Sequence, residues 1–151
     1  MTIKELIGIG NKTSKIIFPI LIIGIIINIL FPAYFSIGAT SSFVLIISTL
    51  VLIIGLVNCI WAQILIFINV PKHKLITSGP FSIVKHPLYT GACLLVVPSV
   101  GLMLNTWLGV VIGITLFIIL RVYAREEEQK MSNMFGDVWT EYTKKVKIPW
   151  L

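Results

Sequence analysis

Two long stretches of this chain carry no charged residue, and they strongly limit what it can fold into. No Asp, Glu, Lys or Arg occurs between Ile16 and Pro71, and none occurs between Pro87 and Leu120. Each stretch has room for two apolar helices of the length that crosses a bilayer, about 20 residues. Charged residues make up 12% of the whole chain, against about 25% in a typical soluble protein. The sequence therefore predicts an all-α integral membrane protein.

The apolar runs predict about four transmembrane helices in a single membrane domain, residues 1–151. These spans are expected near residues 16–34, 43–69, 89–104 and 107–123. Only Asn105 and Thr106 separate the last two spans, which should therefore form a tight antiparallel hairpin. The last helix is expected to continue beyond the membrane as a cytoplasmic extension, with Gly136 as its carboxyl-terminal stop. The mixed segment before the first span is expected to be an interfacial half-helix or a frayed end.

Basic residues cluster outside the apolar runs, in three groups. The groups are Lys4, Lys12 and Lys15, then Lys72, Lys74 and Lys85, and finally the residues from Arg121 onward. The positive-inside rule places such groups on the cytoplasmic side, so both termini and the segment from Pro71 to Pro87 are expected there. Anionic membrane lipids account for the net charge of +6 better than nucleic acid does.

The segment of residues 75–91 concentrates residue types that can bind a ligand. It contains Gly79-Pro80, His86-Pro87, Tyr89 and Gly91. The proline after His86 favours a turn there, and the glycines allow the backbone to approach a ligand closely. The same residues could instead anchor a surface loop at the membrane interface. No metal site is expected, because no cysteine accompanies His73 and His86.

Three adjacent carboxylates, residues 126–128, follow the last apolar run and point about 100° apart on a helix. Arg125 is the predicted partner of Glu128. Glu127 lies on an apolar stripe, with these helical neighbours: Tyr123, Met131 and Met134. A buried carboxylate needs a cationic or hydrogen-bonding partner. We therefore expect Glu127 either to bind a ligand hydroxyl or cation, or to form a structural ion pair.

The two polar stretches together resemble the cofactor motifs of the isoprenylcysteine carboxyl methyltransferase family. The first is His73-Lys-Leu-Ile-Thr-Ser-Gly-Pro-Phe-Ser-Ile-Val-Lys-His-Pro-Leu-Tyr-Thr-Gly91. The second comprises Glu127-Glu128, Met131, Phe135-Gly136, Tyr142, Val146 and Pro149. The related phospholipid methyltransferases share this plan. The resemblance covers roughly the second half of the chain.

The resemblance implies an S-adenosylmethionine-dependent methyltransferase that acts on a lipophilic small molecule or lipid. It implies a cytoplasmic cofactor pocket built from residues 72–91 and 121–150. The cofactor-binding residues that it implies are His73, Lys74, Leu75, Ile76, Phe81, His86, Pro87, Leu88, Tyr89 and Glu127.

Three positions depart from the family pattern. Lys85 stands where arginine usually precedes His-Pro, and Phe81 stands where tyrosine is usual. Tyr123 occupies the place of the family's substrate-side arginine. Arg121 and Arg125 flank it, and we assign these two to the acceptor side as catalytic candidates. The acceptor group itself stays open among a carboxylate, an amine, a thiol and an isoprenoid.

Two other functions are compatible with the same residues. Membrane sterol reductases have a similar His-Pro-x-Tyr-x-Gly stretch and use NADPH, although the Glu-Glu and Phe-Gly tail favours a methyltransferase. A small membrane protein without catalytic activity is the other alternative.

Overall fold

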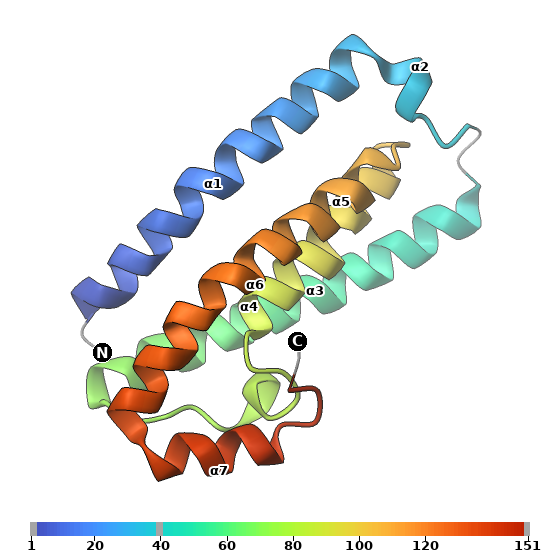
Figure 1. Cartoon of the computed structure of the whole chain (residues 1–151). Coiled ribbons are helices and arrows are strands. Elements are labelled where there is room, and N and C mark those ends of the chain that lie inside the picture. Colours follow the sequence, from blue (N-terminus) through green and yellow to red (C-terminus); the bar gives the residue numbers. More distant parts are fainter. Residues whose placement is uncertain (1–2, 39–40, 150–151) are drawn as a thin grey trace.

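The computed structural model describes residues 3–38 and 41–149 of the chain, with side chains from Thr13 onward. Within these ranges the backbone forms helices, connecting turns and two isolated β-bridges, and no β-strand. Three helices are long and apolar enough to cross a membrane (Figure 1): α1 (Ile3–Leu30), α3 (Ser42–Asn69) and α6 (Leu108–Phe135).

The predicted third span is shorter than these three helices and is not a regular α-helix. Its apolar helical stretch, Pro87–Met103, consists of α4 (Pro87–Thr90), the π-helical η3 (Gly91–Val96) and α5 (Val97–Met103). A turn then reverses the chain, and Asn105 adopts a left-handed φ of 57° that asparagine tolerates well. As a result α5 and α6 lie side by side (Figure 1).

Two predictions about the amino-terminal part of the chain were wrong: the separate half-helix before the first span, and the residue at which the first span ends. The segment before Lys15 is not a separate half-helix, because α1 runs continuously from Ile3. The same helix ends at Leu30 rather than near Tyr34, because Pro32 lacks the N–H needed to continue it. Pro32 instead begins a separate short helix, α2 (Pro32–Phe35).

Small residues allow the helices to pack closely. Along α3, the buried residues Ser48, Gly55 and Ala62 recur every seventh position, and a Cβ atom added to Gly55 would lie 2.8 Å from Leu95 of η3. A Cβ atom added to Gly101 of α5 would lie 2.6 Å from the Cα of Gly109 in α6. The backbones of these two helices therefore touch, as is common between membrane helices.

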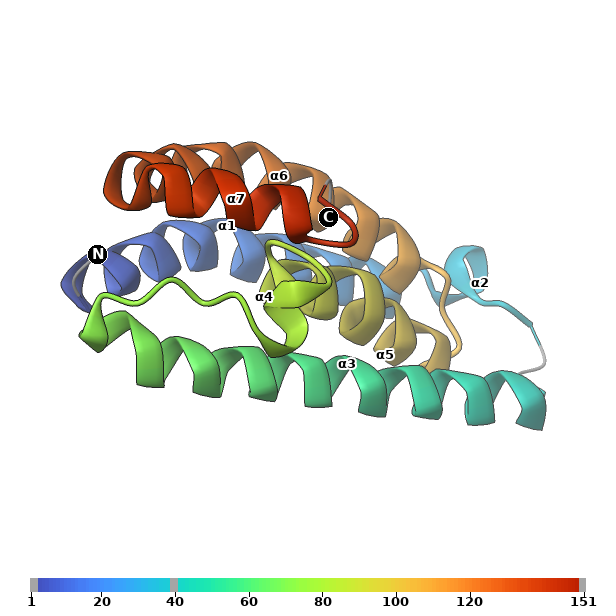
Figure 2. The ribbon, with the colours of Figure 1, turned by 90° about the horizontal axis from the view of Figure 1, so that it is seen from below.

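The helices form a layered arrangement that leaves apolar faces on the outside. Figure 2 shows α4 and α5 between α3 on one side and α6 on the other, while α1 packs on α6. Helix α3 also exposes large apolar side chains that do not line any pocket described below, such as Phe43 at 73% and Ile54 at 61%. Such a surface is expected where lipid tails replace water.

The polar segments gather at one end of this bundle. There the chain forms the short helices η1 (Val70–Lys72) and η2 (Gly79–Ser82), and α7 (Asp137–Lys145) folds back beside them. Gly136, with a φ of +52°, makes the turn from α6 to α7. After α7, the Ile148 amide donates a hydrogen bond of 2.9 Å to the Ile83 carbonyl, and the tail is thereby attached to the η2 region.

Candidate functional site

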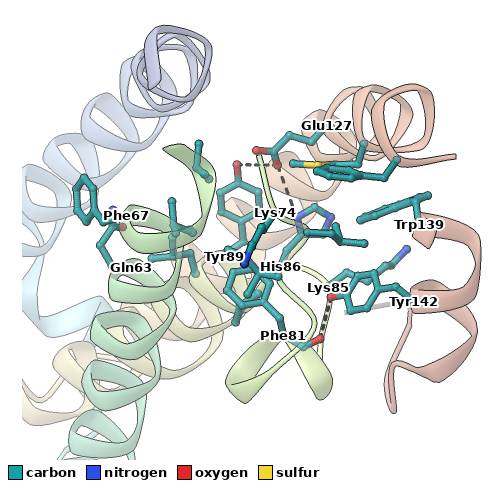
Figure 3. Close-up of a pocket in the computed structure, with 18 of the residues that line it drawn as sticks. Gln63, Phe67, Lys74, Phe81, Lys85, His86, Tyr89, Glu127, Trp139 and Tyr142 are labelled. Atoms are coloured by element: carbon teal, nitrogen blue, oxygen red, sulfur yellow. Dashed lines mark hydrogen bonds and ion pairs between the residues drawn. The ribbon is translucent and has the colours of Figure 1, made fainter. Parts of the chain in front are cut away.

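A pocket of about 470 Å³ lies where α1, α3, α6 and α7 meet the polar segment. Each residue that the resemblance assigned to the cofactor lines this pocket: His73, Lys74, Leu75, Ile76, Phe81, His86, Pro87, Leu88, Tyr89 and Glu127. Figure 3 labels Lys74, Phe81, His86, Tyr89 and Glu127 among them. The two acceptor-side candidates, Arg121 and Arg125, are not among the lining residues. The pocket therefore joins the two polar stretches and leaves these arginines outside.

The start of α4 fixes the orientation of His86 and Tyr89. Pro87 occupies the first turn of the helix, where its missing N–H costs nothing. Asn58 of α3 donates a hydrogen bond of 2.8 Å to the Pro87 carbonyl, which ties this turn to the membrane bundle. The rings of His86 and Tyr89 stack with centroids 5.5 Å apart and planes 12° apart. Both side chains consequently face α6.

Glu127 meets these two rings from the opposite wall of the pocket. The Tyr89 hydroxyl donates a hydrogen bond of 3.2 Å to Glu127 Oε2, and His86 Nδ1 lies 3.6 Å from the same oxygen. The side chain is 17% exposed, which confirms the inward orientation expected from the helical pattern. Within the described part of the chain, Glu127 Oε1 has no hydrogen-bond partner, so this oxygen is available to a ligand.

Glu128 joins the polar segment to α6 through one oxygen atom. Its Oε1 lies 2.8 Å from Lys85 Nζ, 2.8 Å from an Arg121 guanidinium nitrogen and 3.1 Å from His86 Nε2. The expected pairing with Arg125 was wrong. Arg121, two helical turns before Glu128 and about 20° from it around the helix, forms the ion pair, and Arg125 forms none with Glu128 in the described part of the chain. Arg121 therefore holds Glu128 in place.

His86 lies between the two carboxylates and touches each with a different ring nitrogen. Its Nε2 is 3.1 Å from Glu128 and its Nδ1 is 3.6 Å from Glu127. An ionised carboxylate can only accept a hydrogen bond, so the 3.1 Å contact with Glu128 requires a proton on Nε2. Glu128 thereby orients the ring that lies beside Glu127.

Helix α7 closes the pocket with aromatic side chains. Trp139 and Tyr142 both line the pocket, with ring centroids 5.4 Å apart. The Tyr142 hydroxyl donates a hydrogen bond of 2.8 Å to the Phe81 carbonyl. Burial, with a contribution from the Glu128 carboxylate, raises the pKa of Tyr142 to about 12. The hydroxyl therefore remains a donor at physiological pH.

We expect Tyr142→Phe to loosen this attachment without changing the pocket wall. The substitution leaves the Phe81 carbonyl without its donor, a loss of about 1 kcal/mol in the free energy of unfolding. The thermal midpoint in detergent should fall by about 2–4 °C for a chain of this size. Tyr34→Phe is the matched control, because Tyr34 is 78% exposed and its hydroxyl bonds to nothing in the described part of the chain. Equal midpoints for the two variants would contradict the attachment.

Sequence reasoning missed the part of the pocket wall that the long helices supply. This wall consists of Thr13 and Ile17 from α1, of Gln63, Ile66 and Phe67 from α3, and of Val70, which begins η1 directly after α3. Apolar residues on a membrane helix give no sign of whether they face lipid or a cavity. Gln63, an amide within an apolar run, was the one signal in the sequence that could have pointed to this wall.

The assembled site has two chemically different ends. One end offers the Glu127 carboxylate beside His86 and Tyr89, with aromatic rings close by; the other is formed by aliphatic and aromatic side chains of α1 and α3. A carboxylate and aromatic faces suit a ligand with hydroxyl groups and a positive charge. The apolar end suits a hydrocarbon chain.

Comparisons with known proteins identify the family of this chain. Residues 37–133 match the profile of the isoprenylcysteine carboxyl methyltransferase (ICMT) family, and this range covers more than half of the chain. The chain is 31% identical over 74 residues to the protein-S-isoprenylcysteine O-methyltransferases of Mus musculus and Rattus norvegicus. These 74 residues are 49% of this chain and 26% of each relative. No solved structure matches the chain. The profile match and the apolar helices together show that this membrane protein belongs to the isoprenylcysteine carboxyl methyltransferase family.

Proposed function

We propose that the protein is an S-adenosylmethionine-dependent methyltransferase that acts on a lipophilic or membrane-borne acceptor. The observation that carries the proposal is the meeting of two family motifs at one pocket, with Glu127 facing His86 and Tyr89. The names of the rodent relatives, which are isoprenylcysteine O-methyltransferases, support the same reaction class.

The pocket fits the proposed cofactor in size and chemistry. Its volume of about 470 Å³ lies in the range of about 300–1,000 Å³ that is typical of small-molecule sites. Glu127 can accept hydrogen bonds from ribose hydroxyls or an ammonium group, and Phe81 and Trp139 offer flat apolar faces to an adenine ring. S-adenosylmethionine supplies a methyl group that its sulfonium already activates.

The protein's contribution in this proposal is placement and exclusion of water. Helix α7 and its aromatic side chains cover one side of the pocket, and Glu128 fixes the orientation of His86. The acceptor enters from the bilayer at the end formed by α1 and α3. We assign no side chain as a general base. Arg121 acts by holding Glu128 rather than by touching the acceptor.

Transfer of labelled methyl groups tests this proposal directly. Purified protein in lipid nanodiscs receives S-[methyl-³H]adenosylmethionine and one of three acceptor probes. The probes are N-acetyl-S-farnesylcysteine for a carboxylate, phosphatidylethanolamine for an amine and dodecanethiol for a thiol. We expect label in one of them, and a parallel reaction with extracted membrane lipids identifies the natural product. The absence of label from the three probes and from the extracted membrane lipids would contradict the proposal.

We also propose that the pocket and both termini face the cytoplasm, as the distribution of basic residues indicates. In a variant with Cys59 and Cys93 replaced by serine, a cysteine at Ser78 should react with a membrane-impermeant maleimide only in inside-out vesicles. A cysteine at Ile37, at the other end of the bundle, should react only in right-side-out vesicles. Both positions are exposed. The reverse labelling pattern would contradict this orientation.

A further inference from the structure

One amide side chain of the membrane bundle has no hydrogen-bond partner among the residues that the structure describes. Helix α3 carries three amide side chains, and two of them donate hydrogen bonds of 2.8 Å: Asn58 to the Pro87 carbonyl and Asn69 to the Leu65 carbonyl. Gln63 forms no hydrogen bond within the described part of the chain. An unpaired amide in an apolar setting costs free energy. The Gln63 side chain is only partly exposed.

Gln63 lines the pocket at the end away from Glu127. Figure 3 shows Gln63 together with Phe67 on α3 at one side of the pocket, with Glu127 and His86 on the other. Ile66 and Phe67, which follow Gln63 by one helical turn on α3, also line the pocket and are apolar. The amide is therefore a polar group in the part of the pocket that suits a hydrocarbon chain.

We propose that Gln63 is a specificity-determining residue that hydrogen-bonds a polar group of the lipophilic acceptor. This inference rests on the proposed methyltransferase function and deepens it. The acceptor's chain would lie against Ile17, Ile66 and Phe67, and its oxygen or nitrogen would meet the amide. An amide offers both donors and an acceptor, so it can satisfy a polar group that has left water.

A purely structural role for Gln63 leads to the opposite expectation. A structural amide in a membrane helix bonds to a neighbouring helix, as Asn58 does, and its loss destabilises the fold. Gln63 lacks such a bond in the described residues. Replacement by an apolar residue should therefore leave the fold as stable as before or more stable.

The test replaces Gln63 by methionine, which has similar length and no comparable hydrogen-bonding group. With the probe that the wild-type protein methylates, we expect Gln63→Met to raise the acceptor KM about five- to tenfold, the effect of one lost hydrogen bond. The dissociation constant of S-adenosylhomocysteine should stay unchanged. The thermal midpoint should stay equal to that of the wild-type protein or rise. Ile64→Met is the matched control, because Ile64 is the next residue, is 50% exposed and does not line the pocket. Gln63→Leu provides a second variant with the same expected direction.

The outcomes separate this inference from the proposed function. An unchanged acceptor KM in Gln63→Met and Gln63→Leu, with methylation intact, overturns the inference alone. A lower thermal midpoint together with weaker S-adenosylhomocysteine binding indicates a structural role and also overturns it. If the wild-type protein methylates none of the acceptors, the proposed function fails and the inference fails with it.

Discussion

Glu127→Gln is expected to weaken binding of S-adenosylhomocysteine by roughly 10- to 100-fold. The substitution keeps the shape of the side chain and can still accept the Tyr89 hydroxyl, but it removes the negative charge that faces the pocket. Hydrogen bonds to a charged group contribute about 1.5–3 kcal/mol, and 1.4 kcal/mol corresponds to a tenfold change in affinity. Isothermal titration in detergent measures the effect.

Glu126→Gln is the matched control for this variant. Glu126 precedes Glu127 on α6, is exposed and does not line the pocket. We expect its affinity for S-adenosylhomocysteine to equal that of the wild-type protein. If both variants bound with wild-type affinity, Glu127 would not be part of the cofactor site.

Glu128→Gln is expected to have the largest effect on the attachment of the polar segment to α6. The neutral amide loses the charge that now attracts Lys85, Arg121 and His86 to a single oxygen atom. Removing one partner from a fully buried ion pair costs about 3–5 kcal/mol. The Glu128 side chain is 23% exposed, so we expect a loss of about 2 kcal/mol in the free energy of unfolding. His86 also loses its orientation, so cofactor affinity should fall as well.

Glu141→Gln separates this effect from the loss of any surface charge. Glu141 pairs with Lys145 at 3.8 Å, and the two side chains are 72% and 79% exposed. Such exposed pairs contribute little to stability, so the thermal midpoint of this variant should stay at the wild-type value. A Glu128→Gln midpoint equal to that of Glu141→Gln would show that the three contacts of Glu128 do not hold the segment in place.

Local patterns predicted the parts of the fold that depend on nearby residues. Helix α3 spans Ser42–Asn69 where the uncharged run predicted a helix, and α6 ends at Phe135 before Gly136. The inward orientation of Glu127 followed from the residues one turn away on the same helix. Each of these features follows from spacing along a single helix.

Features that depend on contacts between distant segments could not be predicted in this way. One ion-pair partner of Glu128 is Lys85, which lies 43 positions earlier in the chain. Every side of α3 is apolar enough to face lipid. Whether Gln63 points into the pocket therefore depends on how α3 packs against its neighbours. The π-helical geometry of η3 begins at Gly91, two residues after Tyr89, and no pattern in the residues Gly91–Val96 predicted it.

The most direct test of the central claim is equilibrium binding of two cofactors to the same purified protein. Isothermal titration with S-adenosylhomocysteine should give saturable binding to the wild-type protein and weaker binding to Glu127→Gln, whereas NADPH should give none. Binding of NADPH without binding of S-adenosylhomocysteine would contradict a methyltransferase and would favour a reductase. Binding of neither cofactor would show that this pocket does not serve the chemistry proposed for it.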